Sequence, residues 1–285
     1  MTAALELALG ALLFFGLGDL VYKRAAAAGA QAHHFLMVQA WVFLPTVLLY
    51  SILTGSLHFV TGSLWGALAA FFALTGFYNF AHSLKSGAIS INAPVFRLSF
   101  VLTAALAIAL LGEPLTPYKV AGIALALCSA WLLLGGRVDA GSIRSPEARS
   151  SLIRVAVATV AVGIANFIYG LGVRAGATPG SLMVTQAAMV VTLSTSFVAL
   201  KDGRIAPAAP ALRHAPVAGL VLAAAFMLMV ESMARGQASV SVPIAQMGFV
   251  VTALLGFLFL GERFSARKGA GIAAAVAALA CLAHG

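Results

Sequence analysis

Ten apolar segments follow one another along this chain, separated by short stretches that contain charged residues, Gly or Pro. A helix needs about 20 largely apolar residues to cross the hydrocarbon core of a bilayer, and the segments have about that length. The sequence therefore predicts an all-α integral membrane protein with about ten transmembrane helices. The predicted spans are 3–22, 34–54, 62–81, 89–111, 118–135, 153–172, 181–200, 215–233, 240–260 and 268–283.

The small number of charged residues supports this fold class. Charged residues make up 9% of the chain, whereas a soluble domain has about 25%, so the surface must face lipid. The formal net charge of +9 could indicate a nucleic-acid partner, but the basic residues stand singly or in pairs beside apolar runs, as in loops that flank membrane spans. We therefore expect the lipid bilayer as partner and no nucleic acid. Since the first residues lack the basic segment of a signal peptide, the first apolar segment is expected to remain as a span.

An internal repeat divides the chain into two related halves. When the chain is shifted by 149 residues, 83–126 aligns with 232–275 without a gap, and 18 of the 44 positions are identical. The tripeptide Leu-Gly-Glu occurs at 111–113 and again at 260–262. Further aligned pairs, the last four at a shift of 147, are Pro94 with Pro243, Gly16 with Gly163, Asp19 with Asn166, Tyr22 with Tyr169 and Gln39 with Gln186.

The repeat predicts the domain organisation. Residues 1–135 form the first five-helix repeat, 136–151 a polar linker and 152–285 the second five-helix repeat. Because five is an odd number, the two halves enter the membrane in opposite directions. We therefore expect two inverted five-helix repeats around a central cavity, an arrangement typical of secondary transporters.

Two aligned blocks resemble the EamA-type branch of the drug/metabolite transporter (DMT) superfamily. They read APVFRLSFVLTAALAIALLGEPLTPYKVAGIALAL (93–127) and VPIAQMGFVVTALLGFLFLGERFSARKGAGIAAAV (242–276). The resemblance implies ten helices in two inverted repeats around a central cavity, with the fifth and tenth helices peripheral. It also implies export or uptake of small metabolites, often amino acids or related compounds. The family pattern usually has a Trp early in span one, where this chain reads FFGLGDLVYK, so the resemblance fixes no substrate.

Four ionisable residues inside the predicted spans are candidate functional residues, because a charge in the membrane is costly. Asp19 and His82 lie near span ends, where they either reach interfacial water or belong to a site. Arg97 lies about 12 Å inside its span at 1.5 Å per residue and is either a partner of Asp19 or a ligand for an anionic group such as a carboxylate. Glu231 either pairs with Arg235 or belongs to the site. The excess of acids over permanent bases leads to the hypothesis that Asp19 or Glu231 changes protonation and couples transport to protons.

The repeat aligns His82 with Glu231, Arg97 with Gln246 and Asp19 with Asn166. Since the second half is inverted, we expect its three polar residues to lie toward the opposite face from Asp19 and His82. Two such polar layers would suit a pair of gates around one site.

Other polar residues on the spans expected to line the cavity complete the candidate set, and Phe77 and Phe80 add apolar surface. Aromatic walls with a few polar groups suit a small amphipathic ligand, although any single residue could instead make an ordinary interhelical hydrogen bond. Glu113 and Glu262 are expected to be turn and interface residues. The predicted substrate- or ion-binding residues are Asp19, Tyr22, Gln39, Tyr78, Asn79, His82, Asn92, Arg97, Asn166, Tyr169, Gln186, Glu231 and Gln246.

Two arguments give opposite orientations of the chain in the membrane. Of the Lys and Arg residues, 13 are predicted on the side of the linker and 3 on the other side, which by the positive-inside rule places both termini outside. The family resemblance implies both termini inside. We expect the bacterial cytoplasmic (inner) membrane. A monomer and a homodimer are both compatible with a pseudo-dimer that encloses its own cavity.

The predicted function is a secondary transporter that moves a small metabolite, amino acid-like or amphipathic, by alternating access, with export as the favoured direction. A passive channel is the alternative, because an inverted repeat can also build a fixed pore. An integral membrane enzyme is disfavoured, since the sequence lacks paired Asp-rich motifs, a Ser nucleophile on a Gly turn and His/Glu metal spacing. His33 and His34 lie at a predicted loop edge, and Cys128 and Cys281 fall inside apolar segments without a partner at metal-ligand spacing. We expect no catalytic residue, cofactor or metal.

Overall fold

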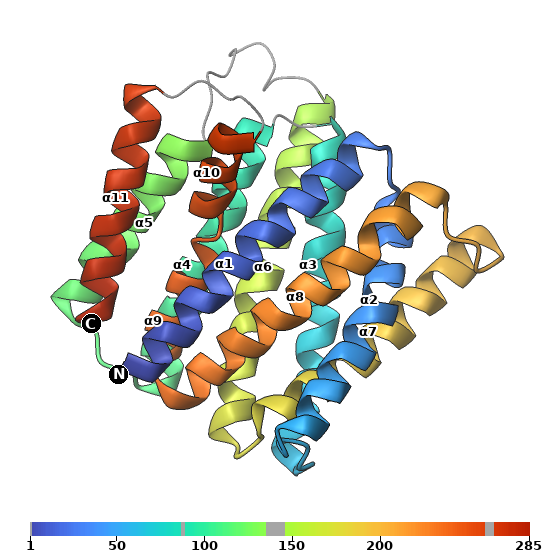
Figure 1. Ribbon diagram of the computed structural model, residues 1–285, viewed down its shortest axis with the longest axis horizontal. Coiled ribbons are helices and arrows are strands. Elements are labelled where there is room, and N and C mark those ends of the chain that lie inside the picture. The colour runs from blue at the N-terminus through green and yellow to red at the C-terminus, as the bar shows by residue number, and fades with distance from the viewer. Residues whose placement is uncertain (1, 87–88, 135–145, 260–264) are drawn as a thin grey trace.

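The computed structural model is built of helices throughout the residues it describes, which are 2–86, 89–134, 146–259 and 265–285 (Figure 1). The first half contains α1 (Thr2–Ala27), α2 (Ala32–Leu53), the short 3-10 helix η1 (Thr61–Leu64), α3 (Trp65–Ser86), α4 (Ile89–Leu111) and α5 (Pro117–Leu134). The second half contains α6 (Pro146–Arg174), α7 (Pro179–Asp202), α8 (Ala209–Arg235), α9 (Ala238–Gln246), α10 (Phe249–Phe259) and α11 (Ala266–Ala283).

Ten membrane crossings can be followed through the described ranges. Nine segments are helical, long and apolar enough to span a bilayer, and α4 supplies the shorter apolar run Val95–Leu111. One of the nine segments, Ala238–Leu255, combines α9 with most of α10. The predicted fold class, an all-α integral membrane protein with about ten spans, is confirmed.

The ninth predicted span, 240–260, is not one continuous helix. α9 ends at Gln246 and α10 begins at Phe249. Pro243 removes a backbone donor from α9 and crowds the preceding turn. The chain then tightens, because the Met247 N–H donates to Ile244 O at 3.1 Å, a bond across three residues that replaces the α-helical one. The expectation of an unbroken span is corrected to two helices with a break at mid-crossing.

The start of α6 also differs from the prediction. This helix begins at Pro146, inside the segment assigned to the polar linker. Pro is favourable at the first helical position, and Glu147 in the first turn complements the positive end of the helix dipole. The rest of the predicted linker, 136–145, lies outside the described residues, as do Glu262 and the side chains of Lys85 and Pro94.

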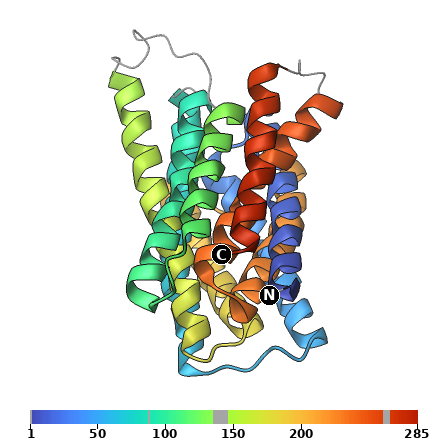
Figure 2. The same cartoon turned by 90° about the vertical axis from the view of Figure 1, so that its left-hand side faces the viewer.

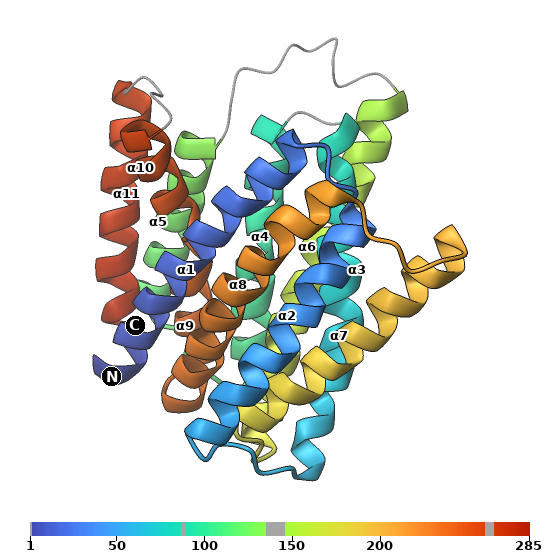
Figure 3. The ribbon, with the colours of Figure 1, turned by 45° about the vertical axis from the view of Figure 1, so that its right-hand side comes forward.

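The helices run between two faces of the molecule. The start of α1 and the end of α11 lie at one end of the bundle, here called the terminus face (Figure 1). The end of α5 and the start of α6 lie at the opposite end, here called the linker face. α2 and α7 lie at the edge of the bundle away from α5 and α11 (Figure 3).

Equivalent residues of the two halves make equivalent contacts, which shows the inverted repeat directly. Thr103 Oγ1 donates to Gly163 O at 3.0 Å, and Thr252 Oγ1 donates to Gly16 O at 2.9 Å. The alignment relates Thr103 to Thr252 and Gly163 to Gly16. The two halves therefore share one packing pattern and not only a sequence pattern.

The same symmetry organises the peripheral pair α5 and α11, which face the viewer in Figure 2. The backbone of Gly122 on α5 lies against Leu282 on α11, and that of Gly271 on α11 lies against Leu133 on α5. Each pair is related to the other by the shift of 149. This interface is self-complementary, as in a two-fold symmetric dimer.

Helices from both halves combine into two packed groups, α3 with α4 and α6, and α1 with α8 and α9. In the α3–α4–α6 group, Asn92 Nδ2 donates to Ser151 Oγ at 2.7 Å and joins α4 to α6. In the α1–α8–α9 group, Ser232 Oγ on α8 donates to Ala4 O at 2.7 Å and lies 2.7 Å from Ser241 Oγ on α9. Each group is therefore fastened internally by polar contacts at equivalent places.

We expect Gly16→Ala to destabilise the protein. A Cβ atom at Gly16 would lie 2.5 Å from Gly248 O and 2.5 Å from Val251 Cβ, and overpacking of this kind costs about 1–3 kcal/mol. The matched control is Gly10→Ala in the same helix, where the Cβ would meet only the end of the Leu228 side chain, at 3.1 Å. Both substitutions gain the same helix propensity. Thermal unfolding in detergent measures the difference, and equal melting temperatures would contradict the close approach of α1 to α10.

Candidate functional site

Arg97 is a buried charge at mid-depth in the bundle. Its side chain is 8% exposed and forms an ion pair with Asp19 on α1. Arg97 Nη1 also lies 3.4 Å from Gln246 Oε1 and 3.4 Å from Gln246 O. Of the two readings that the sequence left open for Arg97, the structure therefore shows the pairing with Asp19. Because the repeat aligns Arg97 with Gln246, two equivalent residues are in contact, which places them close to the pseudo-two-fold axis that relates the halves.

The two separate polar layers expected from the sequence are not observed, because Gln246 of the second half meets Arg97 of the first. The break after α9 explains this contact. A helix that ends leaves its last carbonyls without helical donors, and that end carries partial negative charge, which attracts a cation. The rings of Phe96 and Phe249 lie 5.9 and 5.5 Å from the guanidinium carbon, within the range of a cation–π contact. Arg97 is thus held by a carboxylate, a helix end and two aromatic faces.

A small cavity lies next to this cluster. Its lining includes Gln39 on α2, the equivalent Gln186 on α7, and the rings of Phe43, Phe77 and Phe226. Phe77 connects the cavity to the cluster, since its ring centroid lies 6.3 Å from that of Phe96, the neighbour of Arg97. The cavity volume of about 40 Å³ holds a few water molecules at most. In this conformation the cavity is too small for a metabolite.

One polar pair of the first half has no counterpart in the second. Tyr22 Oη donates to Gln39 Oε1, but the equivalent Tyr169 and Gln186 make no such bond. The buried atoms of the site without a hydrogen-bond partner among the described residues are Asn166 Nδ2, Tyr169 Oη, Gln186 Oε1 and Arg97 Nε. A buried polar atom left in this state costs about 1–3 kcal/mol. These atoms are therefore available to a polar ligand.

Three predicted site residues of α3 have other neighbours. Tyr78 stacks edge-on with His82 at 5.9 Å and with Phe197 at 5.2 Å between ring centroids. Asn79 Oδ1 accepts a hydrogen bond from Arg154 Nη1 at 3.4 Å, on α6. The structure brings these residues together with α6 and α7, and among the described residues no hydrogen bond, ion pair or ring contact joins Tyr78 or Asn79 to Arg97.

Two further predicted residues make structural contacts. Asn92 joins α4 to α6, as described above. Glu231 pairs with Arg235 at 2.5 Å, one turn later on α8, and the Arg235 side chain is 50% exposed. The structure thus shows the alternative reading for Glu231, a local ion pair near the terminus face.

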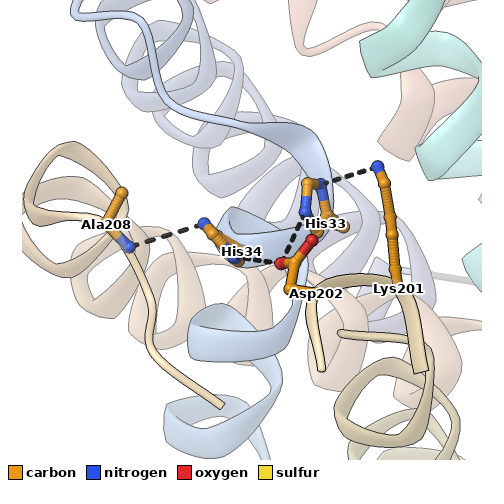
Figure 4. A network of polar contacts seen from close by, with 5 residues as sticks. All are labelled: His33, His34, Lys201, Asp202 and Ala208. Atoms are coloured by element: carbon orange, nitrogen blue, oxygen red, sulfur yellow. Dashed lines mark hydrogen bonds and ion pairs between the residues drawn. The ribbon is translucent and has the colours of Figure 1, made fainter. Parts of the chain in front are cut away.

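A second polar cluster, which the sequence analysis did not recognise, lies at the linker face (Figure 4). His33 Nε2 lies 3.1 Å and His34 Nε2 2.7 Å from Asp202 Oδ2, the carboxylate of the last residue of α7. Both residues lie in the first turn of α2, next to the loop as expected, and both are buried. The pattern around 33–34 carries no signal for a partner that lies 168 residues away in the chain.

The contacts of Nδ1, the nitrogen that does not face Asp202, indicate the tautomer of each histidine ring. His33 Nδ1 faces Lys201 Nζ at 3.4 Å, and His34 Nδ1 accepts from the Ala208 N–H at 3.4 Å (Figure 4). Since both neighbours are donors, both Nδ1 atoms are acceptors and both Nε2 atoms donate to Asp202. The three possible ligand atoms lie within 4.8 Å of one another, but a metal at Nε2 would put the ring proton on Nδ1, where metal-bound His normally requires an acceptor. The cluster fits a hydrogen-bonded tie between α2 and α7 better than a metal site.

Comparison with known proteins gives a family match over nearly the whole chain. A family model described as the EamA-like transporter family matches residues 2–135 and 144–283. A solved structure described as "Crystal structure of protein" is similar, with a TM-score of 0.80 and 18% sequence identity over 99% of this chain and 96% of that chain. At this identity the likeness shows a shared fold only. The search of curated proteins gave no match.

We expect Arg97→Gln and Asp19→Asn each to destabilise the protein by roughly 2–4 kcal/mol, because each leaves a charge inside the membrane without its partner. The double variant removes both charges and should recover most of the loss. In the matched pair Glu231→Gln and Arg235→Gln, where Arg235 is half exposed, each change should be below about 1 kcal/mol. Unfolding in detergent measures all five variants. Losses that simply add in the Asp19/Arg97 double variant would contradict the ion pair.

We expect Zn²⁺ to leave the melting temperature of the protein unchanged, because both Nδ1 atoms of the histidine cluster face donors. Nitrogen-15 NMR of labelled histidine should show both rings protonated at Nε2, with His33→Gln and His34→Gln as assignment variants. A Zn²⁺-dependent rise in melting temperature that either variant abolishes would instead show a metal site.

Proposed function

Since this chain belongs to the EamA-like transporter family, we propose that it is a secondary carrier that moves a small amphipathic solute by alternating access. The family places the chain among membrane transporters of small solutes, and its apolar spans place it in the bilayer as a multi-pass protein. The proposal adds the class of solute, the residues that hold it and the means of coupling.

The observation that carries the proposal is the set of buried polar atoms that have no partner among the described residues, on Arg97, Asn166, Tyr169 and Gln186. Gln186 lines the cavity, and the ring of Tyr169 lies 6.2 Å from that of Phe226, which also lines it. The first half closes its own polar pairs, Tyr22 with Gln39 and Asp19 with Arg97. Of the equivalent residues in the second half, Asn166, Tyr169 and Gln186 each have a buried polar atom without a partner among the described residues, whereas Gln246 contacts Arg97. A solute that supplied donors and acceptors to Asn166, Tyr169 and Gln186 would remove their desolvation penalty, which gives a reason for their burial.

The chemistry of the lining indicates the class of solute. A guanidinium recognises a carboxylate by two parallel hydrogen bonds, and Arg97 Nε has no partner among the described residues. Phe43, Phe77 and Phe226 provide an apolar wall in the cavity next to the Arg97 cluster. A small solute with a carboxylate and an apolar part, such as an amino acid-like compound, fits both features.

The size of the cavity favours a carrier over a fixed pore. A channel needs a continuous passage, whereas about 40 Å³ of space has no room for a metabolite until helices move. A conformational change between states open to either face therefore has to accompany each transported molecule.

Proton coupling follows from competition for one guanidinium. Asp19 neutralises Arg97 in this structure, and a solute carboxylate would have to take its place. Protonation of Asp19 would release Arg97, so solute binding and proton binding favour each other, and solute affinity should rise as the pH falls. Glu231 is less suited to this role because Arg235 already pairs with it near the surface. We further propose the bacterial inner membrane as the location. Because the proton binds together with the solute, an inward proton gradient would drive uptake, so export, the direction favoured from the sequence, would have to run down the solute's own gradient.

The proposal predicts a rise in melting temperature with carboxylate-bearing solutes. The purified protein in detergent is tested against amino acids, amines, sugars and nucleobases at two pH values, because a ligand of the folded state stabilises it by mass action, about 2.7 kcal/mol at 100 times Kd. The shift should be larger at the lower pH, absent for the decarboxylated amine, and lost in the Asp19→Asn/Arg97→Gln double variant. The Glu231→Gln/Arg235→Gln variant should keep it. A shift that the Asp19/Arg97 variant retains would remove Arg97 from the site.

The solute that raises the melting temperature is then used to measure flux into vesicles that contain the protein. Saturation and acceleration by solute on the far side would support a carrier, whereas flux that is linear in concentration would support a channel. Wild-type flux should respond to a pH gradient, and Asp19→Asn should not. An equal response in both proteins would contradict proton coupling through Asp19.

A further inference from the structure

The start of α9 is held by a residue of the other half of the chain. Glu113, just beyond the end of α4, accepts hydrogen bonds from the Ala238 N–H at Oε1 and the Ser239 N–H at Oε2, both at 2.8 Å. Gln237, the residue before α9, gives this helix no side-chain cap. A carboxylate at a helix N-terminus is favoured by hydrogen bonding and by the dipole. Glu113, expected to be a turn and interface residue, is therefore the cap of α9.

A buried lysine adds a second fastening at the same place. Lys119 on α5 is fully buried, and its Nζ donates to Pro114 O at 2.6 Å and to Gln237 Oε1. An ammonium remains in such a position only when hydrogen bonds replace its hydration. Glu113 and Lys119 on one side, and 237–239 on the other, are called here the terminus-face latch.

α9 connects this latch to the candidate site. The helix has nine residues and a length of about 13 Å at 1.5 Å per residue. Its first residues bind Glu113, and its last residue, Gln246, contacts Arg97. The break before α10 separates α9 from the rest of its crossing, and the Ser241–Ser232 contact ties it to α8. A displacement at one end of α9 is thus transmitted to the other.

We propose that the terminus-face latch is the gate of that face and that α9 couples the gate to Arg97. Glu113 and Arg97 both join the α3–α4–α6 group to the α1–α8–α9 group, one at the face and one at mid-depth. When Glu113 releases α9, this group can separate from the α3–α4–α6 group on the terminus face, and Gln246 withdraws its carbonyl from Arg97. Opening of the gate therefore removes the Gln246 contact from the guanidinium, and a solute that enters from that face then has only Asp19 to replace. The inference rests on the alternating-access function proposed above and names the residues that close one side.

The test measures access to α9 by cysteine labelling. In a Cys128→Ala/Cys281→Ala background, Ser239→Cys reports on the latch, and Ser194→Cys, a buried serine of α7, reports on a region away from it. Glu113→Gln replaces one acceptor oxygen by an NH₂ group that faces an N–H donor. It should accelerate maleimide labelling at Ser239→Cys about tenfold, which corresponds to about 1.4 kcal/mol, and leave labelling at Ser194→Cys unchanged. Glu147→Gln, at an exposed acid of α6, is the matched control and should change neither rate.

Two other results would overturn the gate. Unchanged labelling at Ser239→Cys would show that Glu113 does not hold α9 closed, and faster labelling at both reporters would show a general loosening of the fold. Gln237→Ala, which removes the Lys119 contact but keeps the cap, should accelerate labelling at Ser239→Cys alone, and it carries the test should Glu113→Gln fail to fold. Labelling requires no solute, so a failure of Arg97-dependent transport would contradict the proposed function and leave the gate standing. Transport that depends on Arg97, found together with unchanged labelling, would contradict the gate and leave the proposed function standing.

Discussion

A permanent positive charge inside a bilayer has to be neutralised and hydrogen-bonded where it lies, and in this protein that requirement falls on Arg97. Asp19 supplies the opposite charge, and the interrupted helix that ends at Gln246 supplies a carbonyl acceptor. Each contribution comes from a different helix, so α1, α4 and α9 have to meet at one point. The close approach of α1 to α10 at Gly16 and the break in the ninth crossing accompany that meeting.

The sequence was sufficient for the fold because bilayer thickness sets the length of the apolar segments and an odd number of spans per half sets their direction. It was not sufficient for the break in span nine. A proline stands at equivalent positions 94 and 243, yet α4 continues from Ile89 to Leu111 while α9 stops. Proline alone therefore does not decide the outcome. The Met247–Gly248 pair that follows in the second half, where the first half has Leu98 and Ser99, distinguishes the two.

The candidate site was predictable in part. The pairing of Asp19 with Arg97 was one of two open readings, because two opposite charges inside a membrane have few other partners. The contact of Gln246 with Arg97, the cap by Glu113 and the histidine cluster with Asp202 are joined only by tertiary packing, over 149, 125 and 168 residues. A repeat alignment reads the halves side by side, so it identifies equivalent residues but not those that touch across the boundary. The unpaired state of Tyr169 and Gln186 depends on such packing as well.

The contact between Arg97 and Gln246 also bears on the origin of the chain. Two separate five-helix subunits with one sequence would place the same residue twice at their symmetry axis. An arginine there would face its own copy in a medium of low dielectric constant, where like charges repel strongly. Joining the halves into one polypeptide let each copy of the position diverge, so that a cation could stand opposite an amide. A charged centre of this kind is available to a fused gene and closed to a symmetric homodimer.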